Sequence, residues 1–137
     1  MPSTPERSYS LIEDIILSHG TRGMDRIRSA VPKGSCGRAA KLILENRGRV
    51  LIGTGFPVGG SFETDGPIGA IALYRVLEGL GHEPVFGCAP PISQVLAGDF
   101  RTLEVPILGW EATRPMVESA LADIRPSVVV SIERPGV

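Results

Sequence analysis

Three carboxylates stand in the sequence where parallel α/β sheets place their ligand sites. Glu63 and Asp65 follow the apolar run 50–52 after a loop, and Glu133 directly follows the apolar run 127–132. Both runs are predicted strands, and open α/β sheets bind ligands in the loops at the carboxyl ends of their strands. A carboxylate whose pKa is raised by partial burial can serve as a general base or acid. Glu63, Asp65 and Glu133 are therefore the candidates for acid–base chemistry.

The first of these loops is rich in glycine and leads into a helix. Four glycines within residues 53–60 let the backbone turn sharply and approach a ligand closely. Thr64 or Asp65 can cap the helix that follows, and Pro67 suits its first turn. The free amides of that turn would then face the loop and form an anion site. They belong to Gly66, Ile68 and Gly69.

Length and composition exclude several classes of protein. A chain of 137 residues with 42% hydrophobic and 21% charged residues fits one globular domain. The net charge of −1 offers no basic face for nucleic acid and no polybasic membrane anchor. The polar N-terminus and the short apolar runs predict neither a signal segment nor a membrane span, so we predict a cytoplasmic protein. Cys36 and Cys88 are predicted to be buried or half-buried thiols, without a disulfide or a metal.

Helices and strands are predicted in alternation along the chain. Apolar periodicity predicts helices at 9–19, 24–31 (stopped by Pro32), 37–46 (capped by Ser35), 67–80 (stopped by Gly81) and 114–124, and a helical turn at 92–97. Strands are predicted at 49–52, 84–86, 103–108 and 127–132, the last buried on both faces. This order predicts an α/β fold with a mainly parallel sheet and right-handed crossovers.

Two regions follow from this order. Residues 1–48 are predicted to be a helical segment that packs on the domain, and residues 49–137 to be the α/β domain itself. The chain stops just after its most strand-like segment, and its few strands would leave a sheet edge uncovered. We therefore expect an incomplete domain, which a missing C-terminal half or a second copy in a homo-oligomer would complete.

Four segments together resemble the D-glutamate cyclase family. They are 54–58 (TGFPV), 63–70 (ETDGPIGA), 77–81 (LEGLG) and 132–136 (IERPG), and the likeness spans about residues 22–136 by order and spacing. The resemblance implies a Rossmann-like α/β domain of three layers. It also implies a hydro-lyase that closes D-glutamate to 5-oxo-D-proline with loss of water. Members of the family continue into a second half with a Gly-Asp-Gly-Gly-Asn-Glu type motif, which is absent here, so the chain would be an N-terminal half that could bind without turning over.

Lactam formation needs a base near the amine, an electrophilic γ-carboxylate and a folded substrate. Glu63 or Asp65 would serve as base or acid, and Glu133 would orient Arg134 or bind the substrate ammonium group. Arg134 would pair with one substrate carboxylate in a bidentate manner. The predicted binding residues for this amino-acid substrate are Thr54, Gly55, Thr64, Gly66, Gly69 and Arg134. No cofactor or metal is predicted, and a divalent metal stays open.

Each residue also has a simpler interpretation. Asp65 could only cap its helix, Glu63 could be a solvated loop carboxylate, and Thr54 could satisfy backbone groups of the turn. Glu133 and Arg134 could form a surface ion pair of little energetic value.

Two other functions compete with the cyclase. A nucleotide- or small-anion-binding module without catalysis would use the same glycine-rich loop. However, Val58 stands where a dinucleotide fingerprint has its third glycine, and the chain has no Walker Lys-Ser or Lys-Thr pair. The second alternative is a non-catalytic remnant whose sheet edge recruits a partner chain.

Overall fold

The computed structural model describes residues 4–18, 23, 26, 28 and 30–134. The chain divides into two compact units, Met1–Asn46 and Arg47–Val137, and each unit is described by itself. No helix among the described residues has both the length and the apolar character needed to cross a membrane.

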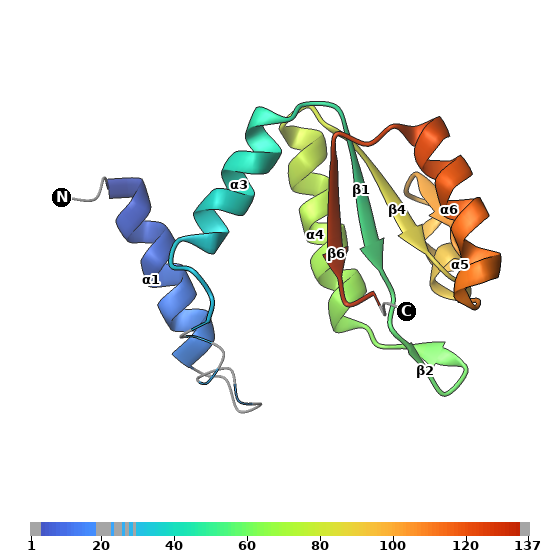
Figure 1. The fold of residues 1–137 in the computed structure, drawn as a ribbon, viewed down its shortest axis with the longest axis horizontal. Coiled ribbons are helices and arrows are strands. Elements are labelled where there is room, and N and C mark those ends of the chain that lie inside the picture. The colour runs from blue at the N-terminus through green and yellow to red at the C-terminus, as the bar shows by residue number, and fades with distance from the viewer. Residues whose placement is uncertain (1–3, 19–22, 24–25, 27, 29, 135–137) are drawn as a thin grey trace. The chain divides into compact units, whose positions relative to one another are not determined.

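The second unit is built on a four-stranded parallel sheet (Figure 1). Its strands lie in the order β5-β4-β1-β6, and every neighbouring pair is parallel. Their bounds are β1 (Arg49–Thr54), β4 (Glu83–Cys88), β5 (Thr102–Glu104) and β6 (Val128–Ile132). A separate antiparallel hairpin follows β1 and is formed by β2 (Pro57–Val58) and β3 (Ser61–Phe62).

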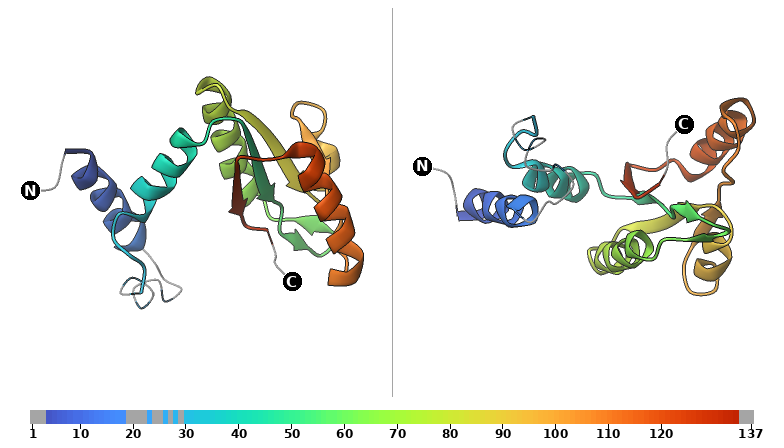
Figure 2. Two further views of the ribbon diagram at one scale, coloured as in Figure 1. Left: turned by 45° about the horizontal axis from the view of Figure 1, so that its top comes forward. Right: turned by 90° about the horizontal axis from the view of Figure 1, so that it is seen from below.

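Helices cover both faces of this sheet (Figure 2). The helices α4 (Asp65–Gly79) and α5 (Ile92–Leu96) lie on one face, and α6 (Trp110–Ile124) lies on the other. Each parallel strand is thus joined to the next by a connection that contains a helix, as parallel pairing requires. The unit is a small Rossmann-like α/β domain of three layers with a parallel sheet, which confirms the predicted fold class.

The hydrophobic core of this unit lies between the sheet and α4, because strand side chains alternate between the two faces. Ile52 of β1 is fully buried and is the register partner of Phe86 in β4. Phe86 packs against Tyr74 of α4, with ring centroids 4.7 Å apart. Leu51 and Gly53, which alternate with Ile52, therefore face α6. This division decides which side chains can meet at each side of the sheet.

The end of α4 agrees with the helix stop that was predicted at Gly81. Gly81 has a φ of 81°, its amide donates to the carbonyl of Glu78 at 3.0 Å, and the amide of His82 donates to the carbonyl of Leu77 at 2.9 Å. This pair of bonds is a Schellman motif, in which a left-handed glycine lets the last carbonyls of a helix find partners.

Two of the predicted strands differ in the structure. The strand expected over 103–108 is β5, which ends before Pro106 because proline cannot donate a hydrogen bond to a ladder. The last strand, β6, was expected to be buried on both faces, and this is wrong. Among the described residues β6 pairs only with β1, and the side chain of Val129 is 60% exposed.

The helix expected over 114–124 begins four residues earlier in the structure, as α6. The carbonyl of Gly109 accepts hydrogen bonds from the amides of Ala112 and Thr113, which starts the helix before Arg114. Pro115 consequently lies inside the helix instead of near its start.

The first unit contains α1 (Thr4–Ser18) and α3 (Ser35–Glu45). Its main polar feature is Glu13 of α1, which is only 4% exposed and accepts hydrogen bonds from the amides of Gly34 and Cys36, both at 2.7 Å. These amides open α3 and have no partner inside the helix. A carboxylate from one helix therefore caps the next. The predicted cap, Ser35, is wrong: its hydroxyl donates to the carbonyl of Pro32 instead.

Two other sequence predictions lie wholly or largely outside the described residues. They are the end of the first helix at His19 and Gly20, and the helix expected over 24–31, where only residues 26, 28, 30 and 31 are described.

The cap formed by Glu13 predicts an acid-sensitive first unit. Hydrogen bonds from the amides of Cys36 and Gly34 lower the pKa of Glu13 below its ordinary value of 4.5. A carboxyl group with a lowered folded-state pKa stabilises the fold above 4.5, and this stabilisation is lost as the pH falls through the lowered pKa. Thermal unfolding followed by circular dichroism should therefore show a drop in melting temperature on acidification that Glu13→Gln largely removes. Glu45→Gln, at an exposed carboxylate, is the control and should retain the drop.

Candidate functional site

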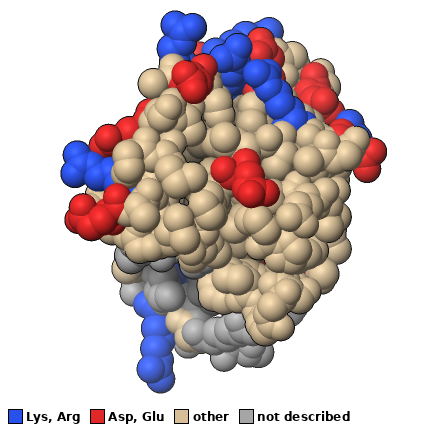
Figure 3. Space-filling view, turned by 90° about the vertical axis from the view of Figure 1, so that its right-hand side faces the viewer, with Lys and Arg blue, Asp and Glu red and all other residues tan. Residues whose placement is uncertain are grey.

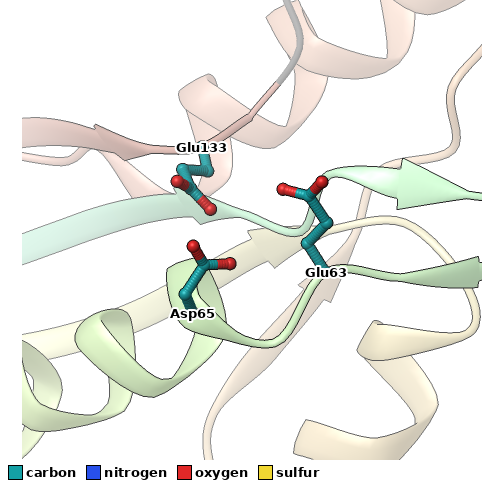
Figure 4. A group of neighbouring side chains, drawn as sticks. All are labelled: Glu63, Asp65 and Glu133. Atoms are coloured by element: carbon teal, nitrogen blue, oxygen red, sulfur yellow. The ribbon is translucent and has the colours of Figure 1, made fainter. Parts of the chain in front are cut away.

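The structure brings together the three carboxylates that the sequence singled out (Figure 4). One oxygen each of Glu63, Asp65 and Glu133 lies within 4.8 Å of the others, although they come from three separate segments. Glu63 follows the hairpin, Asp65 is the first residue of α4, and Glu133 directly follows β6. We call these three side chains the acidic cluster. It stands at the carboxyl edge of the sheet, where this fold class binds its ligands.

A left-handed backbone places Glu133 in the cluster. Its φ of 50° is unusual for a residue other than glycine and costs on the order of 1–3 kcal/mol. The side chain packs against the start of α4: a Cβ added at Gly66 would lie 2.7 Å from Oε2 and 2.9 Å from Cβ of Glu133. Glycine at position 66 is therefore what allows Glu133 to approach the helix.

Glycines also shape the loop that carries Glu63. Gly55 has a φ of 93°, and a Cβ there would lie 2.6 Å from Cγ2 of Ile92. Residues 59–60 have positive φ as well and form the turn between β2 and β3. The amide of Glu63 then donates to the carbonyl of Phe56 at 3.0 Å, which returns the chain to the end of β1. The glycines thus fold the loop back so that its carboxylate reaches the cluster.

The start of α4 differs from the sequence prediction. Thr64 occupies the capping position, but neither it nor Asp65 caps the helix with its side chain. The amide of Ile68 donates to the carbonyl of Thr64 at 3.1 Å and is not free for a ligand, and Gly69 is exposed within the helix. Asp65 instead contributes a negative charge at the positive end of the helix dipole.

The cluster is open to solvent. Glu63, Asp65 and Glu133 are all exposed, so the partial burial that was the condition for a general base or acid is not met at these residues. Thr54, by contrast, is fully buried at the end of β1, and its hydroxyl has no hydrogen-bond partner within the described segments. It does not satisfy the turn, as one interpretation of the sequence had it. The chemical capacity of the open cluster is to hold a cation, either an ammonium group or a metal ion with oxygen ligands.

Arg134 lies on the other side of the sheet. Its side chain runs over Gly53, Nη2 donates to the carbonyl of Val105 at 2.8 Å, and burial lowers the pKa of its guanidinium group. The structure therefore separates two adjacent residues: Glu133 faces α4, while Arg134 faces α6. The surface ion pair between Glu133 and Arg134, one alternative from the sequence, does not form among the described residues.

The surroundings of Arg134 were not predicted from the sequence. A cavity of about 200 Å³ lies beside this residue, and Gly87 and Ser131 are among the residues that line it. Gly87 is the register partner of Gly53 in the neighbouring strand. No local signal marks this pair, because the register of two strands depends on the whole sheet.

The two cysteines are both free, as predicted. Cys88 is buried in β4, and burial raises the pKa of its thiol to about 11. It therefore stays protonated at neutral pH and is a poor nucleophile. Cys36 is exposed instead of buried.

Comparison with known proteins agrees with the resemblance found in the sequence. A family model described as D-glutamate cyclase-like, C-terminal, matches residues 12–137. A search of the curated proteins found no match. The family match covers most of the chain, including the hairpin, the start of α4 and the residues after β6 that form the acidic cluster. The chain therefore belongs to the D-glutamate cyclase-like family.

Proposed function

We propose that this domain binds D-glutamate at the acidic cluster and takes part in its closure to 5-oxo-D-proline with loss of water. One observation carries the proposal: Glu63, Asp65 and Glu133 converge at the carboxyl edge of the sheet in a chain of this family. The cluster suits the ammonium group of an amino acid, since each carboxylate oxygen can accept one of its N–H bonds.

The reaction needs a proton relay, which neighbouring carboxylates can provide. Ring closure joins the amine nitrogen to the γ-carbon and releases one γ-oxygen as water. The ammonium nitrogen gives up two protons in total, and both end in that water. In the proposed mechanism one carboxylate of the cluster takes a proton from the ammonium group, and the neutral amine then attacks the γ-carbon. The same carboxyl group returns this proton to the leaving oxygen, and the second proton passes from the nitrogen of the ring-closed intermediate to that oxygen, which leaves as water. Holding the folded substrate in place supplies a large share of the acceleration.

The same geometry argues against the nucleotide-binding alternative. Nucleotide sites of this fold class place phosphates at a helix N-terminus, where free amides and the helix dipole attract anions. Here three exposed carboxylates surround the start of α4, and the amide of Ile68 is already bonded. A phosphate at this position would be repelled by the cluster. The cation-binding interpretation is the one that the charges support.

Calorimetric titration tests the binding half of the proposal. The chain should bind D-glutamate or 5-oxo-D-proline more tightly than NAD or ATP. Product formation is measured on the 137-residue chain by chromatography of 5-oxoproline. Binding of a nucleotide with no response to either acid would contradict the proposal.

Asp65→Asn separates the chemical role of this residue from a structural one. Because Asp65 makes no capping hydrogen bond, the substitution removes only its interaction with the helix dipole, worth about 0.3–1 kcal/mol. We expect a melting temperature close to that of the unaltered chain. The rate of 5-oxo-D-proline formation should fall by a factor of roughly a hundred or more. Unaltered turnover would return Asp65 to a purely structural role.

A further inference from the structure

The cavity beside Arg134 has an unusual floor. Gly53 in β1 and Gly87 in β4 are register partners on the face toward α6, so two adjacent positions of the central strands carry no side chain there. The resulting space of about 200 Å³ is lined mainly by apolar side chains of the sheet and of α6. These include Leu51, Leu103, Val105, Val117, Leu121 and Val129. The cavity lies at the carboxyl end of the parallel strands.

Among the described residues that line the cavity, Arg134 is the single charged one. One of its terminal nitrogens, Nη2, is occupied by the carbonyl of Val105. The other, Nη1, is buried and has no hydrogen-bond partner in the part of the chain that the structure describes. A buried cationic donor without an acceptor is unfavourable, and such groups in folded proteins are paired. The cavity thus combines an apolar space with one buried cationic N–H group that lacks an anionic acceptor.

The surroundings of the cavity favour a small ligand over a large partner. The face of this unit around α6 carries few charged side chains at its centre, and its Lys, Arg, Asp and Glu residues gather toward the edges (Figure 3). The described residues that line the cavity offer no second basic side chain beside Arg134 for the multiple charges of a phosphate. One donor in an apolar space matches one carboxylate oxygen. The volume corresponds to roughly six water molecules, which suits a ligand of similar heavy-atom count.

We infer that this cavity is a binding site for a small monocarboxylate with a compact apolar body. The carboxylate accepts a hydrogen bond from Nη1 of Arg134, and the body lies among the apolar side chains that the sheet and α6 contribute to the cavity. The site is distinct from the acidic cluster, which lies on the α4 side, and it does not depend on the proposed reaction. It would take branched or short-chain carboxylic acids, and it would reject their neutral amides.

Isobutyrate and isobutyramide are the probes, because they share a shape and differ in charge. Titration of the 137-residue chain, followed by the NMR amide resonances of Gly53 and Gly87, should show isobutyrate binding with roughly tenfold or greater preference over isobutyramide. Arg134→Gln should lower the affinity for isobutyrate by roughly tenfold to a hundredfold. Arg101→Gln, at an exposed arginine outside the cavity, is the control and should leave the affinity unchanged.

Gly53→Ala tests the cavity at a second position, next to Cβ and Cγ of Arg134. A Cβ at this position would lie 3.8 Å from the nearest atoms, an ordinary contact, so the fold should accept it. The added methyl group should lower the affinity for isobutyrate several-fold more than the affinity for the smaller acetate. Gly98→Ala, where a Cβ meets open space, should change neither affinity. Equal binding of isobutyrate and isobutyramide, or unchanged isobutyrate affinity in both Arg134→Gln and Gly53→Ala, would overturn the inference. These outcomes are independent of whether D-glutamate is bound or converted.

Discussion

Glu133→Gln is expected to lower the rate of 5-oxo-D-proline formation by roughly 10²–10⁴-fold, the usual contribution of an acid–base group. The side chain is exposed and makes no ion pair among the described residues, so the folded state should lose little stability. Binding of D-glutamate to the chain should weaken roughly tenfold or more, because the neutral amide accepts less strongly from an ammonium group. Rates are measured by chromatography of the product, and affinities by calorimetry.

A second substitution moves the same carboxylate without changing its chemistry. In Gly66→Ala the new Cβ would lie 2.7 Å from Oε2 and 2.9 Å from Cβ of Glu133, so Glu133 must leave its position. Gly79→Ala, at the other end of α4, meets no atom within 4 Å and serves as the control. We expect Gly66→Ala to resemble Glu133→Gln and Gly79→Ala to resemble the unaltered chain. If Gly66→Ala and Glu133→Gln each kept full activity, Glu133 would not be part of the site.

Local sequence signals predicted the elements of the second unit well. The alternation of apolar runs and helical periodicity identified β1, β4, α4, α5 and β6 in the right order, because each pattern depends on its own few residues. The helix stop at Gly81 is equally local: glycine alone satisfies the left-handed turn of the Schellman motif without strain. The same reasoning identified α6 but placed its start at Arg114, four residues after its first residue, Trp110.

Features that depend on distant segments could not be predicted. The sequence indicated that Glu63, Asp65 and Glu133 stand at strand ends, but not that Arg134 turns to the opposite side of the sheet from its neighbour. That separation follows from the left-handed backbone of Glu133, whose side chain packs against Gly66. The capping of α3 by Glu13 is similar, since the carboxylate and its amide partners lie more than twenty residues apart.

The exposure of β6 shows why burial was harder to predict than strand position. Three consecutive valines predicted a strand buried on both faces. The strand forms as expected, but burial depends on the elements packed on each side. Here β6 lies at the edge of the described sheet, and Val129 is exposed on the α6 face. Composition predicts the strand, whereas its neighbours determine its burial.

Gly55→Ala is expected to destabilise the second unit by about 2–5 kcal/mol. Two effects add at this position. The φ of 93° is unfavourable for any residue with a side chain, and the new Cβ would lie 2.6 Å from Cγ2 of the buried Ile92. Because Gly55 starts the loop that carries Glu63, any relaxation of this contact should also displace the acidic cluster. Urea unfolding followed by circular dichroism measures the change in free energy of unfolding.

Gly60→Ala separates the two effects. Gly60 also has a positive φ, of 82°, but a Cβ there meets no atom within 4 Å, so only the backbone term of about 1–2 kcal/mol should appear. The difference between the two variants then measures the contact with Ile92. A double variant, Gly55→Ala with Ile92→Ala, should show a coupling energy that recovers part of this difference, because the two residues touch. Equal destabilisation by Gly55→Ala and Gly60→Ala would show that the loop moves away from Ile92 without cost, and that α5 does not hold the loop in place.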